Sequence, residues 1–385
     1  MQFNKLEKAL NSLYGRHQGI KTTQLFASGR ICLLGEHIDY NGGEVITAAI
    51  DQGIRVIYRP TYNKILCLSS LQQEKELIIN LEELIKFDAS KDWGNYVLGI
   101  YKSFADKGEK LRGAEIVFDC DIPIGSGLSS SAALLVLNGV LLNHVHETGL
   151  SKFDIAKLCQ QVENNFIGLQ SGLMDPAAIA LGKKNELLCL DCRDGNYNHL
   201  PIDMPNHTFL IFDTAKSRRL SDSAYNDRAE ACKKALSEIN NKKGKEESWR
   251  DLKLEDIRLL EDIVLQKRAR HVISEMNRVE NAKGLLKNHD LKGFGKLMSE
   301  SHQSLKEDYE VSCTELDCFV DWANNNDKCL GAKMTGAGFG GCAIAIVDKA
   351  SASDLIPEIE SIYFEETGLK GKAFLSNAGN GVQEL

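Results

Sequence analysis

The sequence predicts an α+β protein with two lobes. Its 385 residues exceed what one hydrophobic core usually holds, so we expect two domains or one large bilobed unit. Strand-like and helix-like stretches are intermixed without the regular βα repeat that builds a doubly wound parallel sheet. We place the boundary after residue 185, so that residues 1–185 form the N-terminal lobe and residues 186–385 form the C-terminal lobe.

The first half combines strand candidates with amphipathic and apolar helices. Residues 1–14 carry apolar side chains at helical spacing, which predicts an amphipathic helix. The other helices expected in this half are 92–104, 129–147 and 152–167. The expected strands are 25–34, 44–59, 113–123 and a hairpin over 64–80. Helix 152–167 begins with a capping pattern, because Ser151 precedes Asp154 by three residues.

The second half begins with strands and continues mostly as helix. Two short strands are expected at 186–191 and 208–213, and helices should then dominate up to about residue 326. Within that part, the polar stretch 239–251 predicts an exposed loop with solvated charges. The chain should close with strands 329–335, 342–347 and 371–376 and a helix near 352–364, and with a glycine cluster at 336–341 between the first two strands.

Composition restricts the partners that the chain can have. The formal net charge is -8 and Lys and Arg are scattered, which argues against a broad nucleic-acid surface. The sequence has no apolar stretch of 18 residues and its first twenty residues have no signal-peptide core, so we expect no membrane partner. The eleven cysteines are irregularly spaced, which favours reduced thiols. We therefore expect a cytoplasmic protein, and we expect it to be a monomer.

The stretch PIGSGLSSSAALLVL, residues 123–137, predicts a phosphate-binding loop at the start of a helix. A helix start has backbone N–H groups without internal partners and a partial positive charge, which together bind anions. Gly125 and Gly127 allow positive φ or close approach, and the serines at 129–131 can cap the helix or offer hydroxyls. The alternative is a flexible turn before a well-capped core helix, and this stretch alone leaves both open. A P-loop and a dinucleotide fingerprint are excluded by the missing lysine and third glycine.

A second segment, SGRICLLGEHIDYNGG at residues 28–43, places several polar residues between apolar strand residues. On composition alone it could be an exposed turn after a strand. Together with the serine loop, however, it resembles the signature of galactokinases within the GHMP family of small-molecule kinases. PIGSGLSSSAAL resembles the second motif of that family, and KMTGAGFGGCAIAIV at 333–347 resembles the third.

The resemblance covers nearly the whole chain. Further segments match galactokinase patterns in order, namely DWGNYVLG, SGLMD, DSAYNDRAEAC and ESHQSLKEDYEVSCTELD. The implied fold has an N-terminal lobe like domain 2 of ribosomal protein S5, a ferredoxin-like C-terminal lobe and an active site in the cleft between them. The implied activity is ATP-dependent phosphorylation of the 1-hydroxyl of D-galactose.

The resemblance also implies roles for individual residues. The matching sugar-binding residues are Glu36, His37, Asp39, Gly172, Asp175 and Tyr225. Asp175 matches the catalytic aspartate, which accepts the proton of the sugar hydroxyl or orients that hydroxyl, and Arg30 matches the arginine that faces both this Asp and the transferring phosphate. Carboxylates suit sugars because they accept strong hydrogen bonds from neighbouring hydroxyls.

ATP and Mg²⁺ are the implied co-substrate and metal. The matching ATP-binding residues are Gly125, Ser126, Gly127, Leu128, Ser129, Ser130 and Ser131, with Trp93 near the adenine. Ser131 and Glu163 match the Mg²⁺ ligands, and Glu163 lies 12 residues before Asp175, as in the family. Taken alone, Trp93 could equally be a core aromatic, Glu163 a solvated helical residue, and Asp175 before Pro176 a turn or cap.

Some positions depart from the galactokinase pattern. Ile38, Ser171 and Pro176 replace the usual Thr, Cys and Gln. Ser217 stands where a basic residue is usual near the phosphates, which leaves its neighbours Lys216, Arg218 and Arg219 to supply the cation. The alternatives are a kinase for N-acetylgalactosamine or another galactose-like sugar, and a non-catalytic galactose sensor. A mevalonate or homoserine kinase is disfavoured by the sugar-type group at Glu36, His37 and Asp39.

Overall fold

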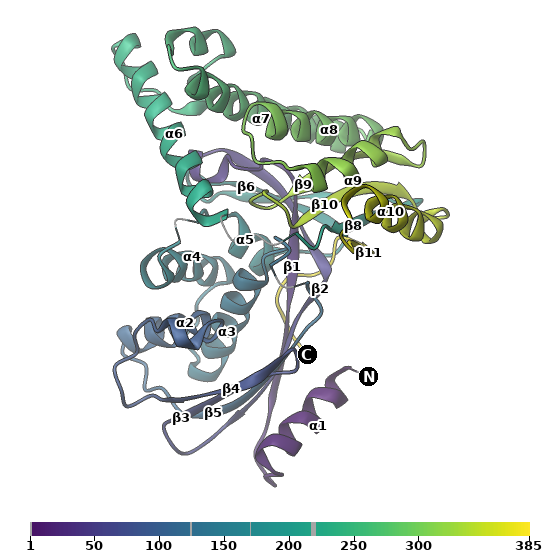
Figure 1. The fold of residues 1–385 in the computed structure, drawn as a ribbon. Helices are drawn as coiled ribbons and strands as arrows, with labels where there is room; N and C mark the ends of the chain where they lie inside the picture. The colour runs from purple at the N-terminus through teal and green to yellow at the C-terminus, as the bar shows by residue number, and fades with distance from the viewer. Residues whose placement is uncertain (1, 124, 170, 217–220) are drawn as a thin grey trace.

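Two β-sheets and the helices packed on them make up the computed structural model of the chain, which describes residues 2–123, 125–169, 171–216 and 221–385 (Figure 1). In this described part, the larger sheet has eight strands in the order β12-β1-β2-β5-β3-β4, with β6 and β7 branching from β2. Its strands are β1 (Thr23–Leu34), β2 (Glu44–Pro60), β3 (Ile65–Ser70), β4 (Gln73–Asn80), β5 (Ala114–Cys120), β6 (Glu186–Asp191), β7 (Tyr197–Pro201) and β12 (Gln383–Glu384).

Helices lie on both faces of this sheet (Figure 1). The helices on one side are α2 (Gly94–Asp106), α3 (Ser130–His146), α4 (Lys152–Val162) and α5 (Met174–Leu181). Helix α3 is apolar all round, as expected of a helix that is buried between α2, α4, α5 and the sheet. On the opposite face, α1 (Gln2–Tyr14) packs Leu6 and Leu10 against Ile57 and Val117 in a small separate cluster.

The smaller sheet is antiparallel, with the strand order β11-β8-β10-β9. Its strands are β8 (His207–Asp213), β9 (Cys329–Thr335), β10 (Cys342–Asp348) and β11 (Lys372–Ser376). The helices of this half are α6 (Ser221–Lys243), α7 (Ile263–Lys287), α8 (Leu291–Glu307), α9 (Thr314–Asn325) and α10 (Ala352–Thr367). Helices α8 and α9 pack on β9, and α7 packs on α8. No helix in the described ranges is long and apolar enough to cross a membrane.

The predicted α+β class is confirmed, and nearly every expected element is present within a few residues. Two short strands, β7 and β12, and the short helix α5 were not expected. The boundary after residue 185 stays a prediction; β6 and β7, which follow it, pair within the larger sheet, and β12 pairs Gln383 and Glu384 with Phe26 and Leu25 of β1. The eleven cysteines, all in the described ranges, are free, as the sequence predicted.

The prediction of an exposed loop over 239–251 is wrong. Helix α6 continues through Lys243, and a short 3₁₀ helix at Trp249–Asp251 places the Trp249 ring in the core. The charges are not merely solvated either, because Lys243 forms ion pairs with Glu247 and Asp256. Because Trp249 stands among charged residues, the sequence pattern did not indicate that this large apolar side chain is buried. Its burial fixes the path of the segment.

Candidate functional site

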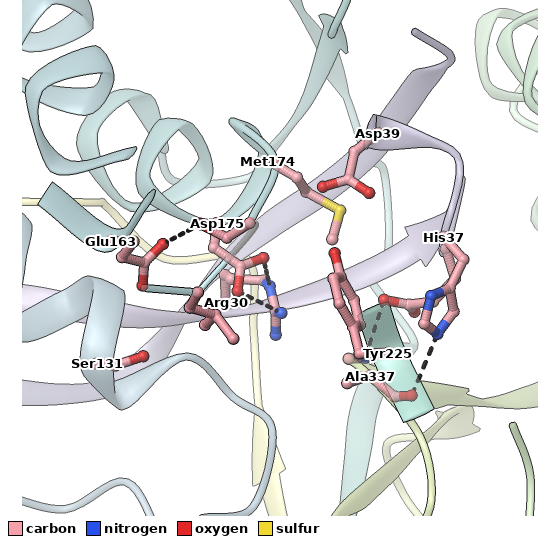
Figure 2. Close-up of a pocket in the computed structure, with 14 residues that line it drawn as sticks. Arg30, His37, Asp39, Ser131, Glu163, Met174, Asp175, Tyr225 and Ala337 are labelled. Carbon is pink, nitrogen blue, oxygen red and sulfur yellow. Dashed lines mark hydrogen bonds and ion pairs between the residues drawn. The ribbon is translucent and has the colours of Figure 1, made fainter. Parts of the chain in front are cut away.

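The three segments singled out in the sequence meet at one polar hollow of about 130 Å³, which is lined by residues from both halves of the chain (Figure 2). The expected residues that line it are Arg30, Glu36, His37, Asp39, Ser131, Glu163, Gly172, Asp175 and Tyr225. They come from the end of β1 and its turn, the start of α3, the end of α4, the start of α5 and α6. Sequence reasoning missed Leu169, Met174 and Ala337 as lining residues. Met174 could have been found as the neighbour of Asp175.

Arg30 and Asp175, which both line this hollow, form a bidentate ion pair. Arg30 Nε donates to Asp175 Oδ1 over 2.7 Å, and Nη2 donates to Oδ2 over 2.8 Å. The Arg30 side chain is almost fully buried, whereas 29% of the Asp175 side chain is exposed. Burial lowers the pKa of Arg30, but the charges of Asp175 and Glu36 outweigh it and the net shift is upward. The aspartate is therefore held by a permanently charged group and still open to a ligand.

The phosphate loop is tied to the same arginine. Arg30 Nη1 donates to the carbonyl of Gly127 over 2.6 Å, and the Arg30 amide donates to the carbonyl of Leu128 over 3.1 Å. Gly125 and Gly127 both have positive φ, of 73° and 82°, which favours glycine at these turns. The loop and the ion pair therefore form one unit.

Ser129 departs from its expected capping role. Its backbone has a φ of 61° and its hydroxyl donates to Asp175 Oδ2 instead of capping α3. The side chain thereby adds a second donor to the carboxylate that Arg30 holds. The first N–H groups of α3 are left for a ligand, which fits anion binding better than a capped core helix.

A second hollow, of about 370 Å³, adjoins the first and is mostly apolar. Trp93, Tyr96, Phe118 and Leu134 line it, together with Gly125, Ser130 and Ser131. Ser131 lines both hollows, so the start of α3 lies where they meet. An aromatic wall on one side and a helix N-terminus at the junction suit a nucleotide whose base and phosphates lie in that order. Ser126 is buried in the loop between them.

Glu36 is held from the second half of the chain. Its Oε2 accepts from Lys333 Nζ over 2.7 Å and its Oε1 accepts from the Gly336 amide over 2.9 Å. Both side chains of this ion pair are buried, with exposures of 1% and 0%. Burial lowers the pKa of Lys333, but the charge of Glu36 outweighs it and keeps the lysine protonated.

His37 is buried and neutral. Burial lowers its pKa to about 3. Its Nε2 lies 3.2 Å from the Ala337 carbonyl, which can only accept, so Nε2 carries the proton and Nδ1 accepts from the Tyr40 hydroxyl over 2.9 Å. The imidazole ring is tilted toward Tyr225, with 5.5 Å between ring centroids. The third glycine motif thus supports the sugar signature through its backbone.

Asp39 lies across the hollow from Asp175 (Figure 2). Burial raises the pKa of Asp39 to about 7, and the charge of Asp175 adds to this shift. A hydroxyl that donates to Asp39 would favour its charged form and lower that pKa again. Two carboxylates that face one small hollow suit a ligand with several hydroxyl groups.

Gly172 is required by the close approach of Asp39. A Cβ at residue 172 would lie 2.0 Å from Asp39 Oδ2. We expect Gly172→Ala to displace the Asp39 carboxylate and to raise the KM for the sugar that the sequence predicts as substrate about 5- to 100-fold, because overpacking costs about 1–3 kcal/mol. Steady-state kinetics at saturating ATP measures this. Gly284→Ala, in α7 with open space around it, is the control and should leave KM unchanged. An unchanged KM in Gly172→Ala would rule out this packing argument.

Glu163 and Ser131 are the candidate metal ligands. Glu163 begins a π-helical turn, Glu163–Ile167, that ends α4 and directs its carboxylate into the hollow. Ser171 Oγ donates to it over 2.6 Å, and burial raises its pKa to about 7 with a smaller contribution from Asp175. No cluster of three acidic, His or Cys ligands is found among the described residues. One buried carboxylate and one hydroxyl nevertheless fit Mg²⁺, which takes most of its ligands from water and nucleotide phosphates.

Of the three residues that could supply the cation near the phosphates, Lys216 alone lies in the described ranges. Lys216 Nζ donates to Glu315 Oε2 over 2.7 Å, and its side chain packs beside Gly340 of the third motif. Arg218 and Arg219 lie outside the described residues, as does Ser217. Lys216 is therefore near the site but engaged by a carboxylate.

Comparisons with known proteins agree with this geometry. The family models described as GHMP kinases N terminal domain, GHMP kinases C terminal and galactokinase galactose-binding signature match residues 95–183, 282–365 and 11–60. A galactokinase of Clostridium tetani is 41% identical over 100% of this chain and 98% of its own length. A galactokinase of Fusobacterium nucleatum is 37% identical over 94% of this chain and 95% of its own length.

A solved structure shows the same likeness. The crystal structure of Lactococcus lactis galactokinase complexed with galactose superposes with a TM-score of 0.94 at 34% identity, covering 100% of both chains. The crystal structure of Methanococcus jannaschii mevalonate kinase covers 95% of this chain and 100% of its own, with a TM-score of 0.65 at 22% identity. The second comparison shows a shared fold only.

Proposed function

This chain belongs to the galactokinases of the GHMP kinase family and is an ATP-dependent sugar kinase, and we propose that it transfers the γ-phosphate of ATP to the 1-hydroxyl of D-galactose. The products would be galactose 1-phosphate and ADP. The observation that carries this assignment is the Arg30–Asp175 pair, which lies beside the junction of a carboxylate-lined hollow and an aromatic-lined one.

The geometry supports separate roles for the residues that line the polar hollow and for those of the phosphate loop. The sugar occupies the polar hollow, where Asp39, His37 and Tyr225 face its hydroxyls. Asp175 accepts the proton of the attacking hydroxyl or orients that hydroxyl, and Arg30 holds the carboxylate in place through two hydrogen bonds. The terminal phosphates lie at the start of α3, where backbone N–H groups stabilise their charge. Arg30, which faces Asp175 and the phosphate loop, is placed to stabilise charge on the transferring phosphoryl group.

Ser131 and Glu163 would hold Mg²⁺ beside these phosphates, where the bound ion supplies charge neutralisation of the phosphate oxygens. The raised pKa of Glu163 supports this role, because no Lys or Arg of the described ranges forms an ion pair with this buried carboxylate, and a cation would stabilise its charged form. The contact from Ser171 orients the Glu163 carboxylate.

The choice of sugar is tested by comparing substrates. We propose D-galactose over N-acetylgalactosamine, because the chain matches the galactokinase galactose-binding signature and is similar to a solved galactokinase complexed with galactose. ATP consumption with galactose, N-acetylgalactosamine, glucose and mevalonate should give the highest kcat/KM for galactose. A higher value for N-acetylgalactosamine would assign the alternative substrate, and binding of galactose without turnover would assign a sensor. We further propose that the enzyme acts as a cytoplasmic monomer.

A further inference from the structure

The turn that presents Glu36 and His37 to the polar hollow is held by helix α7. Glu275 Oε1 accepts from the Gly35 amide over 2.7 Å, and His271 Nε2 donates to the Glu36 carbonyl over 3.0 Å. Because His271 and Glu275 are four residues apart, they lie on one face of α7 and contact consecutive residues of the turn. Neither side chain lines the hollow itself.

Both α7 side chains are fixed by their own partners. Glu275 also accepts from Ser301 Oγ over 2.8 Å and from Arg278 Nε over 2.7 Å. His271 Nδ1 lies 3.0 Å from Ser304 Oγ, and its ring packs 4.5 Å from that of Tyr309. Both His271 and Glu275 are completely buried, so no water competes for these hydrogen bonds.

The turn has little freedom to adjust if these hydrogen bonds are lost. Gly35 has a φ of 96°, and a Cβ there would lie 2.8 Å from Val45 Cα and 2.9 Å from the Glu44 carbonyl. The backbone is therefore packed tightly on the β2 side and hydrogen-bonded on the α7 side. A shift of the turn along β1 would move Glu36 and His37 together relative to the sugar.

We infer that His271 and Glu275 are positioning residues that set the sugar affinity by fixing the backbone of residues 35–37, without touching the substrate. The inference rests on the proposed sugar kinase activity. The second, mostly apolar hollow shares none of these contacts. Of its lining residues, Trp93 precedes α2, Tyr96 lies in α2 and Ser130 begins α3. The structure therefore assigns α7 an effect on sugar binding that is separate from nucleotide binding.

The test uses His271→Phe, which keeps the ring and removes the donor to the Glu36 carbonyl. We expect the KM for galactose to rise about tenfold while the KM for ATP changes less than twofold, because an unsatisfied buried carbonyl displaces the turn. His271→Gln retains an amide donor and should recover most of the galactose affinity. Isothermal titration with galactose alone gives the same comparison without turnover.

His302→Phe is the matched control. His302 is a buried histidine on α8 whose ring contacts Asp317 and the Met334 amide. It should lower the melting temperature and leave the galactose KM unchanged. If His271→Phe is insoluble, Glu275→Asp, which keeps the charge beside Arg278 but shortens the reach to Gly35, serves as the second variant. Equal increases in both KM values, an equal effect of His302→Phe, or no recovery by His271→Gln would overturn the inference. Absence of sugar turnover in the unmodified enzyme would instead refute the proposed function.

Discussion

Replacing Asp175 with Asn lowers kcat for galactose by about 10²- to 10⁴-fold, the range that general acid–base groups typically contribute. The amide is nearly isosteric, but it cannot accept the hydroxyl proton. It also places an NH₂ group against Arg30 Nε in one orientation, or against both Arg30 Nη2 and the Ser129 hydroxyl in the other. Single-turnover measurements at saturating ATP and sugar separate this loss of the chemical step from binding.

Asp191→Asn is the matched control for that loss. Asp191 on β6 forms a similar two-pronged pair with Arg250, with both contacts at 2.7 Å, outside both hollows. Its replacement should change kcat less than twofold. The assigned chemistry is wrong if Asp175→Asn and Arg30→Ala both keep near-normal turnover, or if the two Asn variants are equally impaired.

Replacing Lys333 with Met should cost about 3–5 kcal/mol of unfolding free energy, the typical effect of removing one partner of a buried ion pair. Among the described residues Lys333 is the one ion-pair partner of Glu36, whose side chain is only 1% exposed. Glu36 would therefore keep the hydrogen bond from the Gly336 amide but lose its ion pair. Urea unfolding followed by fluorescence measures the change.

The double variant Glu36→Gln with Lys333→Met distinguishes the ion pair from packing. It removes the unpaired charge, so part of the lost stability should return. If the double variant is as unstable as Lys333→Met alone, the loss comes from the missing lysine stem and not from the uncompensated charge of Glu36.

The sequence was sufficient for the fold class and for the segments that form the site. Their signals are local: glycines before an apolar helix, a polar turn after a strand, and the segment SGLMD that ends in Asp175. The contact between Lys333 and Glu36 could not be predicted in this way, because a lysine in a strand usually faces solvent. Its inward direction is set by a carboxylate 297 residues away in the sequence.

Other features depended on tertiary context in the same manner. Ser129 is a residue type that favours helix caps, and the proximity of Asp175 overrides that preference. The π-helical turn at Glu163 continues an ordinary helical pattern, so periodicity alone gave one helix over 152–167. The contacts of α7 with residues 35 and 36 could not be predicted from the sequence either, because the residues involved form no recognisable motif.

The pairing of β12 with β1 has a consequence for biosynthesis. Leu25 and Phe26 are translated long before their edge partners, which are residues 384 and 383. Until those residues have been translated, β1 offers an open edge to other nascent chains or to chaperones. The larger sheet is therefore completed only after all four strands of the smaller one have been synthesised.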